Sequence, residues 1–280
     1  MFTKETFVVF CPNQISLAVA VGLAEQVGPH QRVIAIYWPL RCTPVPRFPS
    51  NLRLIPYTRL NCFLVGLRAR GRGHTVAVIP HQKLGRLVNF FALICTRVAL
   101  VDDGLDTWRE KPKNVEPESF AEGTDFYTFR YSERLGSWLS RFCIHRVADL
   151  KSIGLSVRPL MDLKDTDRII VESPPLGRVA DKLLLNDKRT TVVVHSNPNK
   201  RTFDSSARKA VDGARIALEA SLDEFSGDVI VGESMVAVYA LAPLKAKYRL
   251  TVYLDKDQVA NLGAFVSLLN SREFCSLELC

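Results

Sequence analysis

Runs of consecutive apolar residues alternate with longer segments of helical periodicity along most of the chain. Strands that are apolar at every position, rather than at every second one, are typical of a parallel sheet buried on both faces. The expected strands are Thr6–Phe10, Arg32–Tyr37, Thr75–Ile79, Val98–Val101, Arg168–Val171, Thr190–Val194, Val229–Val231 and Leu250–Tyr253. The expected helices are Gln14–Val27, Leu60–Arg68, Lys83–Cys95, Ser205–Leu222, Ser234–Leu241 and Val259–Leu269. This order predicts the α/β class, with parallel sheets covered by helices.

The alternation is interrupted between Thr107 and Asp167, where the chain is rich in charged and aromatic residues. We expect one amphipathic helix there, over Ser132–Leu150, within a crossover that joins two α/β domains. With 280 residues, the chain has the length of two ordinary domains. We expect the first domain to comprise residues 1–165 and the second residues 166–280. A cleft between two such domains is a favoured place for a ligand.

Two adjacent acids follow one of the buried strands directly. The apolar run Val98–Val101 leads into Asp102, Asp103 and Gly104. The carboxyl ends of strands in an open α/β sheet are where ligands bind. Adjacent carboxylates disfavour each other's ionisation, which suits a general base, and glycine allows a ligand to approach the backbone closely. The alternative is a strand end followed by an acidic turn.

A histidine ends a strand in the second half of the chain. The run Thr190–Val194 leads into His195, and Ser196, Asn197 and Lys200 follow within a few residues. A serine or asparagine in this position can cap a helix, and the free N–H groups of that helix, together with the imidazole and the ammonium group, would bind a phosphate. The alternative is a polar turn with a partly exposed histidine.

Two further strand ends carry polar residues. Gly232 and Ser234 follow the run Val229–Val231, where the glycine lets a ligand approach and the hydroxyl could contact a phosphate. Asn13 and Gln14 follow the first strand and could bind a substrate rich in hydroxyl groups. For Ser234 and Asn13 the alternative is that the side chain only caps the helix that begins there.

Composition narrows the functional classes. The net charge is +8, which allows peripheral contact with an anionic inner membrane or binding of a phosphorylated substrate. The sequence contains no basic stripe with interleaved aromatic residues, so we do not expect nucleic acid as a partner. The seven cysteines lack the spacing of metal ligands, and with no export signal at the N-terminus they indicate reduced thiols in the cytoplasm. We therefore expect a cytoplasmic protein with no metal site, no membrane-spanning helix and no bound cofactor. The usual dinucleotide and P-loop glycine patterns are missing from the sequence.

The strand-end motifs, taken in their order along the chain, resemble those of the bacterial sialyltransferases and polysialyltransferases. Those families carry an acidic pair before glycine, a His-Pro motif and a serine motif, and the resemblance here spans residues 7–253. It implies GT-B architecture, in which two Rossmann-like domains with parallel sheets face each other across a cleft. The first domain would hold the acceptor and the second the nucleotide.

The resemblance also implies a role for each motif. Asp103, with Asp102 beside it, would act as the general base. His195 would act in catalysis by binding or protonating the phosphate of the cytidine monophosphate (CMP) leaving group, and Ser234 would hydrogen-bond the same phosphate. Gln14 would lie on the acceptor side, as would Asn13 and Gly104. The donor would be CMP-sialic acid or an analogue, the acceptor a glycan or glycolipid, and the displacement inverting and independent of metal.

Two departures from the family pattern keep other functions open. Two residues separate His195 from Pro198, and Met235 follows Ser234 where the family has a second hydroxyl residue. One alternative is a GT-B transferase that uses another nucleotide sugar. The other is a relative that binds a nucleotide or a glycan without catalysis.

Overall fold

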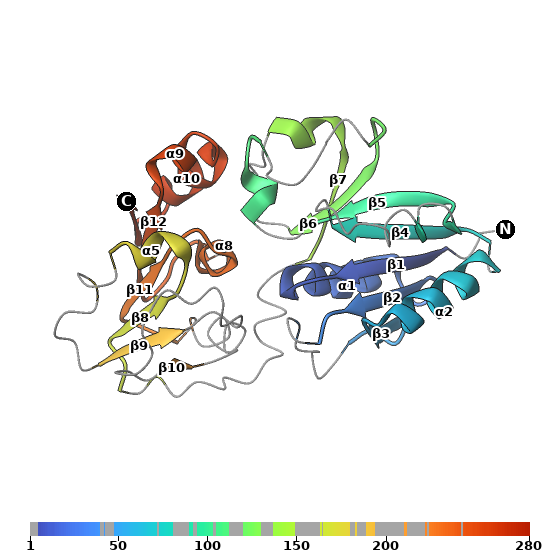
Figure 1. Cartoon of the computed structure of the whole chain (residues 1–280), viewed down its shortest axis with the longest axis horizontal. Helices are drawn as coiled ribbons and strands as arrows, with labels where there is room; N and C mark the ends of the chain where they lie inside the picture. The colour runs from blue at the N-terminus through green and yellow to red at the C-terminus, as the bar shows by residue number, and fades with distance from the viewer. Residues whose placement is uncertain are drawn as a thin grey trace. The chain divides into compact units, whose positions relative to one another are not determined.

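The computed structural model describes residues 5–39, 42, 48–71, 73–80, 90–91, 94–102, 105–111, 120–129, 137–148, 163, 165–179, 183, 189–193, 210–211, 222, 224–241 and 243–280. The chain divides into two compact units, each with its own parallel sheet (Figure 1). Unit 1 comprises Met1–Thr107 and Lys111–Ser156, and unit 2 comprises Trp108–Glu110 and Val157–Cys280. The α/β class and the parallel sheets are therefore confirmed.

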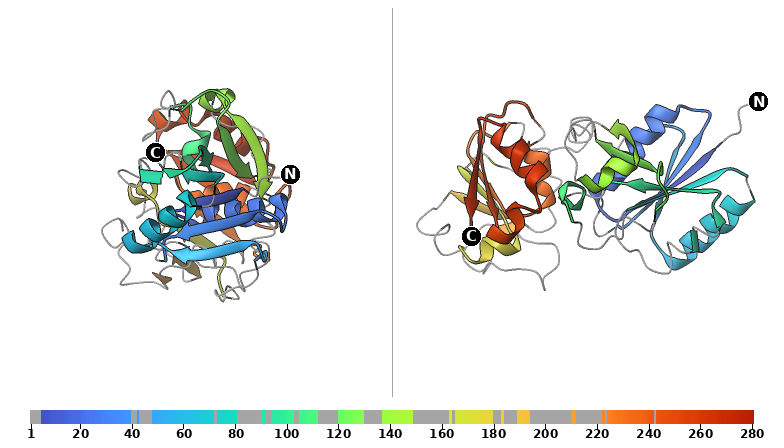
Figure 2. Two further views of the ribbon diagram at one scale, coloured as in Figure 1. Left: turned by 90° about the vertical axis from the view of Figure 1, so that its right-hand side faces the viewer. Right: turned by 90° about the horizontal axis from the view of Figure 1, so that it is seen from above.

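Unit 1 contains a sheet of seven parallel strands within the described residues. Their spatial order is β3-β2-β1-β4-β5-β6-β7, the order of a doubly wound fold with one strand added. Helix α1 (Gln14–Val27) and helix α2 (Arg59–Arg70) cover opposite faces of this sheet, as Figure 2 shows. The strands are β1 (Thr6–Cys11), β2 (Arg32–Tyr37), β3 (Leu52–Pro56), β4 (Thr75–Pro80), β5 (Arg97–Val101), β6 (Asp125–Phe129) and β7 (Cys143–Ala148).

Unit 2 repeats the same strand order. Its described residues form six parallel strands in the order β10-β9-β8-β11-β12-β13. The strands are β8 (Arg168–Val171), β9 (Thr190–Val193), β10 (Ala210–Val211), β11 (Asp228–Val231), β12 (Arg249–Leu254) and β13 (Cys275–Leu279). The helices described in this unit are α5 (Pro174–Gly177), α8 (Met235–Leu241), α9 (Lys256–Val259) and α10 (Gly263–Asn270).

Burial of both sheet faces explains why the central strands are apolar throughout. Every residue of β1 and β4 is buried, and α1 packs on one face of the sheet while Cys62 and Val65 of α2 pack on the other. The termini of α1 are satisfied by side chains. Asn13 accepts a hydrogen bond from the backbone N–H of Ser16 at its start, and the Asn51 amide donates to the carbonyls of Ala24 and Gly28 at its end.

Several expected elements differ from the structure. The helix expected over Ser132–Leu150 is wrong, because Cys143–Ala148 forms β7 and Ser137–Arg141 is a 3-10 turn. Leu139 and Phe142, which lie in this range, are buried in the core, the first on the 3-10 turn and the second just before β7. The crossover also contains β6, so these residues extend the first sheet.

Three other corrections concern the second half of the chain and the early loops. The helix expected over Ser205–Leu222 is wrong at Ala210–Val211, which pair with β9 as a short strand. The helix expected over Val259–Leu269 is divided into α9 and α10. Strands β3 and β13 were not expected at all, and most of the helix expected over Lys83–Cys95 lies outside the described residues. Within the described residues, no helix has the length and apolar content needed to cross a bilayer.

Candidate functional site

The candidate site in unit 2 lies where the strand order reverses. The chain runs from β8 outward to β9 and from β11 outward to β12, while β8 and β11 are themselves neighbours. In a doubly wound sheet, ligands bind in the crevice outside the carboxyl ends of two such strands. Glu172 and Ser173 follow β8, and the turn Gly232–Ser234 follows β11. Two polar segments that are distant in sequence are thus brought to the same place.

A close packing contact joins these two segments. A Cβ atom at position 232 would lie 2.0 Å from Oγ of Ser173, so a side chain there would force the Ser173 hydroxyl to move. The sequence predicted close approach of a ligand to Gly232, and the structure shows close approach of the Ser173 hydroxyl. Ser173 is 3 % exposed, and its side chain makes no capping bond to the short helix α5 that it precedes. The backbone N–H of Glu172 donates to the carbonyl of Val193 at 2.9 Å, which holds the end of β8 to β9.

Both serine hydroxyls at this strand edge are buried without a hydrogen-bond partner among the described residues. This holds for Oγ of Ser173 and for Oγ of Ser234. The backbone carbonyl of Ser234 accepts from the N–H of Ala237 at 3.1 Å, but the hydroxyl makes no capping bond. A buried hydroxyl without a partner costs about 1–3 kcal/mol. Such groups in a native protein call for an explanation, and a ligand with acceptor atoms would supply one.

A buried arginine holds the turn that carries Ser234. The guanidinium of Arg109, 2 % exposed, forms an ion pair with the carboxylate of Glu233 and donates from Nη1 to Oε1 of Gln258 at 2.5 Å. On either side of it, the N–H of Glu110 donates to the carbonyl of Asn261, and Trp108 contacts Phe265 edge to face. All of these residues belong to unit 2. Glu233 stands between Gly232 and Ser234, so Arg109 positions the backbone of the candidate site.

In unit 1, the first acid of the Asp-Asp-Gly motif is described. Asp102 is almost fully buried, and its two carboxylate oxygens accept hydrogen bonds from the hydroxyls of Thr107 at 2.7 Å and Thr128 at 2.6 Å. Its backbone N–H donates to the carbonyl of Tyr127 at 2.9 Å. Asp102 therefore ties the end of β5 to β6 and to the 3-10 turn Leu105–Trp108. Asp103 and Gly104 lie outside the described residues.

The end of β1 carries the predicted acceptor-side residues. Asn13 and Ser16 form a capping box: Oδ1 of Asn13 accepts from the N–H of Ser16 at 3.0 Å, and Oγ of Ser16 accepts from the N–H of Asn13 at 3.4 Å. Capping, the alternative for Asn13, is thus realised. Gln14 is the first residue of α1, and its side chain lies outside the described part of the chain.

The buried thiol beside this helix start is not a nucleophile. Burial raises the pKa of Cys11 well above the ordinary value for a thiol, and the neighbouring Cys42 raises it further. The Sγ of Cys42 donates to the carbonyl of Cys11 at 3.3 Å. Because the reactive form of cysteine is the thiolate, a thiol that stays protonated at neutral pH serves in packing.

The structure brings two of the predicted site residues, Gly232 and Ser234, together with two that sequence reasoning missed, Ser173 and Arg109. Four other predicted phosphate ligands lie outside the described residues: His195, Ser196, Asn197 and Lys200. Ser173 precedes two prolines and gave only the signal of a turn. Arg109 gave no signal, since an isolated arginine in a charged segment is typical of a solvated surface.

Neither the models of known protein families nor the curated proteins with which the chain was compared match it.

Proposed function

We propose that the chain is a GT-B glycosyltransferase that moves a sialic-acid-type sugar from a CMP-activated donor to a glycan acceptor. The observation that carries the proposal is the pair of buried hydroxyls, Ser173 and Ser234, that lack partners at the switch point of unit 2. A nucleotide phosphate presents several acceptor oxygens, and doubly wound sheets bind nucleotides in this position. The choice of CMP and of a sialic-acid-type sugar rests on the order of the strand-end motifs along the chain, which resembles that of the bacterial sialyltransferases.

In this proposal unit 2 stabilises the leaving group. The hydroxyls of Ser173 and Ser234 donate to oxygens of the CMP phosphate, and His195, Ser196, Asn197 and Lys200 provide further donors. Negative charge grows on the phosphate as the glycosidic bond breaks, so donors fixed around it stabilise the transition state more than the ground state. Arg109 acts through Glu233 by holding the Ser234 turn. It also balances the Glu233 carboxylate, whose charge would otherwise oppose that of a phosphate.

Unit 1 supplies the base in this proposal. The carboxylate of Asp103 takes the proton of an acceptor hydroxyl, and the freed oxygen attacks the anomeric carbon of the sugar. The bond from that carbon to the phosphate oxygen breaks, and CMP leaves with the electron pair, so the configuration inverts. We assign a positioning role to Asp102, because both of its oxygens already accept hydrogen bonds from threonine hydroxyls inside the protein.

The test compares binding of CMP with stability of the free protein. Ser173→Ala and Ser234→Ala each remove a hydroxyl that has no partner in the described structure, so the free protein should keep its stability or gain some. Each variant should bind CMP about tenfold more weakly, the loss expected for one hydrogen bond to a charged group. Ser276→Ala is the matched control, since this exposed hydroxyl of unit 2 donates to the Thr251 hydroxyl at 3.1 Å, on an edge strand. Titration calorimetry and thermal unfolding measure the two quantities.

The outcomes separate the proposal from its alternatives. Unchanged CMP affinity in both serine variants, or no CMP binding by the wild type, overturns it. Binding of uridine or guanosine diphosphate in place of CMP indicates another sugar donor. CMP binding without transfer to any acceptor in a glycan panel indicates a binding protein. Asp103→Asn should abolish transfer while CMP affinity stays at the wild-type value.

A further inference from the structure

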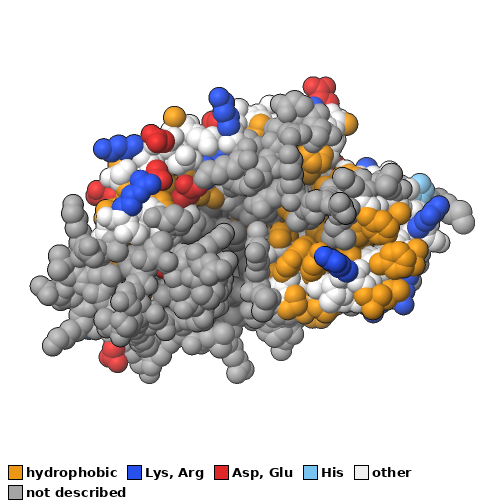
Figure 3. Space-filling model, viewed as in Figure 1, with side chains coloured by type: hydrophobic (Ala, Val, Ile, Leu, Met, Phe, Trp, Pro, Cys, Tyr) orange, Lys and Arg blue, Asp and Glu red, His pale blue; other side chains and the backbone are white. Residues whose placement is uncertain are grey.

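Helix α2 exposes an apolar face to solvent. The side chains of Leu60, Phe63, Leu64 and Leu67 are 65, 50, 40 and 51 % exposed. They lie opposite the residues that the helix buries against the sheet, which are Cys62, Val65, Gly66 and Ala69. Figure 3 shows hydrophobic side chains gathered over this part of unit 1. A single exposed leucine is common on protein surfaces, whereas a contiguous apolar patch marks a site of interaction.

Arginines flank the apolar face on both sides. At 100° per residue, Arg68 lies beside Leu64 on one side, and Arg59 and Arg70 lie beside Phe63 on the other. All three arginines are exposed, and the helix sequence contains no acidic residue. An apolar stripe bordered by arginine is the pattern of a helix that lies in a membrane interface, with its cations among anionic headgroups.

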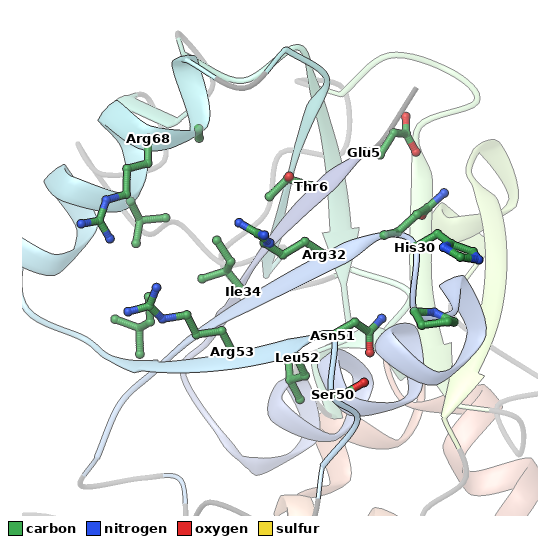
Figure 4. A pocket seen from close by; sticks show the side chains of 15 residues that line it. Glu5, Thr6, His30, Arg32, Ile34, Ser50, Asn51, Leu52, Arg53 and Arg68 are labelled. Atoms are coloured by element: carbon green, nitrogen blue, oxygen red, sulfur yellow. The ribbon is translucent and has the colours of Figure 1, made fainter. Parts of the chain in front are cut away.

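A basic pocket adjoins the same helix. The pocket has a volume of about 820 Å³ and opens at the amino-terminal edge of the unit 1 sheet, where Thr6 and Arg32 begin β1 and β2. Figure 4 shows Arg32, Arg53 and Arg68, from β2, β3 and α2, reaching toward the same space. Arg68 thus belongs both to the pocket and to the border of the apolar face.

The charge in this pocket is not balanced within the described structure. No carboxylate of the described residues lies within 4 Å of Arg32, Arg53 or Arg68. The acid that lines the pocket, Glu5, faces Arg97 at 3.9 Å. Three guanidinium groups around one hollow repel one another, and an anion between them removes that repulsion.

We propose that α2 and the basic pocket together form a docking surface for an anionic lipid membrane. Leu60, Phe63, Leu64 and Leu67 enter the interface, and the pocket receives the phosphate of a lipid headgroup. A protein partner would need an acidic, apolar surface of matching shape, whereas an anionic bilayer supplies charge and apolar volume without one. The pocket opens at the amino-terminal edge of the unit 1 sheet, whereas Asp102 follows the carboxyl end of β5, and the apolar side chains of α2 point away from the sheet. Docking and the proposed chemistry are therefore separable, and this inference does not rest on the proposed function.

The experiment measures cosedimentation of the full chain with vesicles. Vesicles of phosphatidylcholine with phosphatidylglycerol are compared with vesicles of phosphatidylcholine alone. The test variant is Leu67→Ser/Arg68→Gln. Its matched control is Leu244→Ser/Lys245→Gln, another exposed leucine followed by an exposed cation, on unit 2. The arginine contributes about fivefold and the leucine about tenfold to partitioning, so the test variant should bind about fiftyfold more weakly.

The expected result is binding to the anionic vesicles only, lost in the test variant and kept in the control. Binding should also fall at high salt, since the screening length shrinks from about 10 Å at 0.1 M to about 3 Å at 1 M. Circular dichroism confirms that both variants are folded. Equal binding of the test variant and the control overturns the proposal. So does equal binding to the two kinds of vesicle, or a wild-type chain that ignores vesicles but self-associates through α2 in sedimentation velocity.

Discussion

The ion pair between Arg109 and Glu233 determines how firmly the Ser234 turn is held, and it can be broken from either side. In Arg109→Met the side chain keeps much of its volume but loses its charge. The Glu233 carboxylate, 14 % exposed, then loses its ion pair with Arg109. Removing one partner of a buried pair costs about 3–5 kcal/mol, because the other charge stays desolvated and uncompensated. The remaining exposure of Glu233 places the expected loss at the lower end, about 3 kcal/mol.

An exposed pair of the same chemistry in the same unit provides the control. Arg249 and Asp228 lie 2.8 Å apart, and the Arg249 side chain is 81 % exposed. Arg249→Met should cost about 1 kcal/mol or less, because water screens an exposed ion pair. The double variant Arg109→Met/Glu233→Gln should be more stable than Arg109→Met alone, since both charges are then removed together.

The assay must report on unit 2 alone, because a chain of two units need not unfold in one step. The sequence has three tryptophans, of which Trp108 lies in unit 2 while Trp38 and Trp138 lie in unit 1. In protein labelled with 5-fluorotryptophan, the fluorine resonance of Trp108 follows the unfolding of unit 2 in urea. With a slope of about 2 kcal/mol per M, a loss of 3 kcal/mol lowers the midpoint by about 1.5 M.

Two results would refute this reasoning. One is a midpoint for Arg109→Met that falls no further than that of Arg249→Met, which would mean that the pair is as screened as a surface one. The other is a double variant whose loss of unfolding free energy equals the sum of the losses in Arg109→Met and Glu233→Gln. Independent effects of that kind would show that the two charges do not interact.

Three further predictions concern other contacts described above. Gly232→Ala should destabilise unit 2 by about 1–3 kcal/mol, because the added Cβ atom would lie 2.0 Å from Oγ of Ser173. Gly263→Ala should be neutral in the same urea titration, because no atom lies within 4 Å of the Cβ position of Gly263. Thr128→Val should lower the free energy of unfolding of unit 1 by about 1.5–3 kcal/mol, because the hydrogen bond from its hydroxyl to Asp102 is lost. Thr124→Val should cost less, because the hydroxyl of Thr124 donates to the carbonyl of Ala121 at an exposed position. Equal losses in the two variants would contradict the prediction. Burial raises the pKa of Tyr127 to about 12, so the unfolded phenol ionises first as the pH rises, and the free energy of unfolding should fall by about 2 kcal/mol between pH 10 and 12. Tyr127→Phe should lack that part of the fall.

The sequence predicted most of the strands inside each sheet and missed the edge strands, together with β6, which lies between β5 and β7. Strands β1, β4, β8 and β11 are buried on both faces and read as unbroken apolar runs. The missed strands include the two edges of each sheet, β3 and β7 in unit 1 and β10 and β13 in unit 2. An edge strand is partly exposed and carries polar residues, as Glu278 in β13 and Arg53 in β3 show. A search for continuous apolar runs cannot detect such strands.

The candidate site was predicted only where one segment carries its own signal. Gly232 and Ser234 follow an apolar run and precede a helix, so their place at a strand end could be inferred locally. Ser173 gained its role from packing against Gly232, which depends on β8 and β11 being neighbours in the sheet. Arg109 is distant in sequence from the rest of unit 2, so only the fold reveals its pairing with Glu233.

The two units share a strand order but differ in how their strand-end polar groups are satisfied. In unit 1, Asn13 caps α1 and Asp102 accepts from two threonine hydroxyls, whereas Ser173 and Ser234 of unit 2 have no partner among the described residues. Since an unsatisfied buried hydroxyl costs stability until a ligand arrives, binding of the phosphate is expected to stabilise unit 2 alone. With CMP at a hundred times its dissociation constant, the Trp108 resonance should move to higher urea by an amount equivalent to about 2.7 kcal/mol. The resonances of Trp38 and Trp138 should stay where they are. A shift in the urea midpoint of unit 1 as large as that of unit 2 would refute this division of roles. It would mean that the nucleotide also binds the polar groups of unit 1, which already have hydrogen-bond partners.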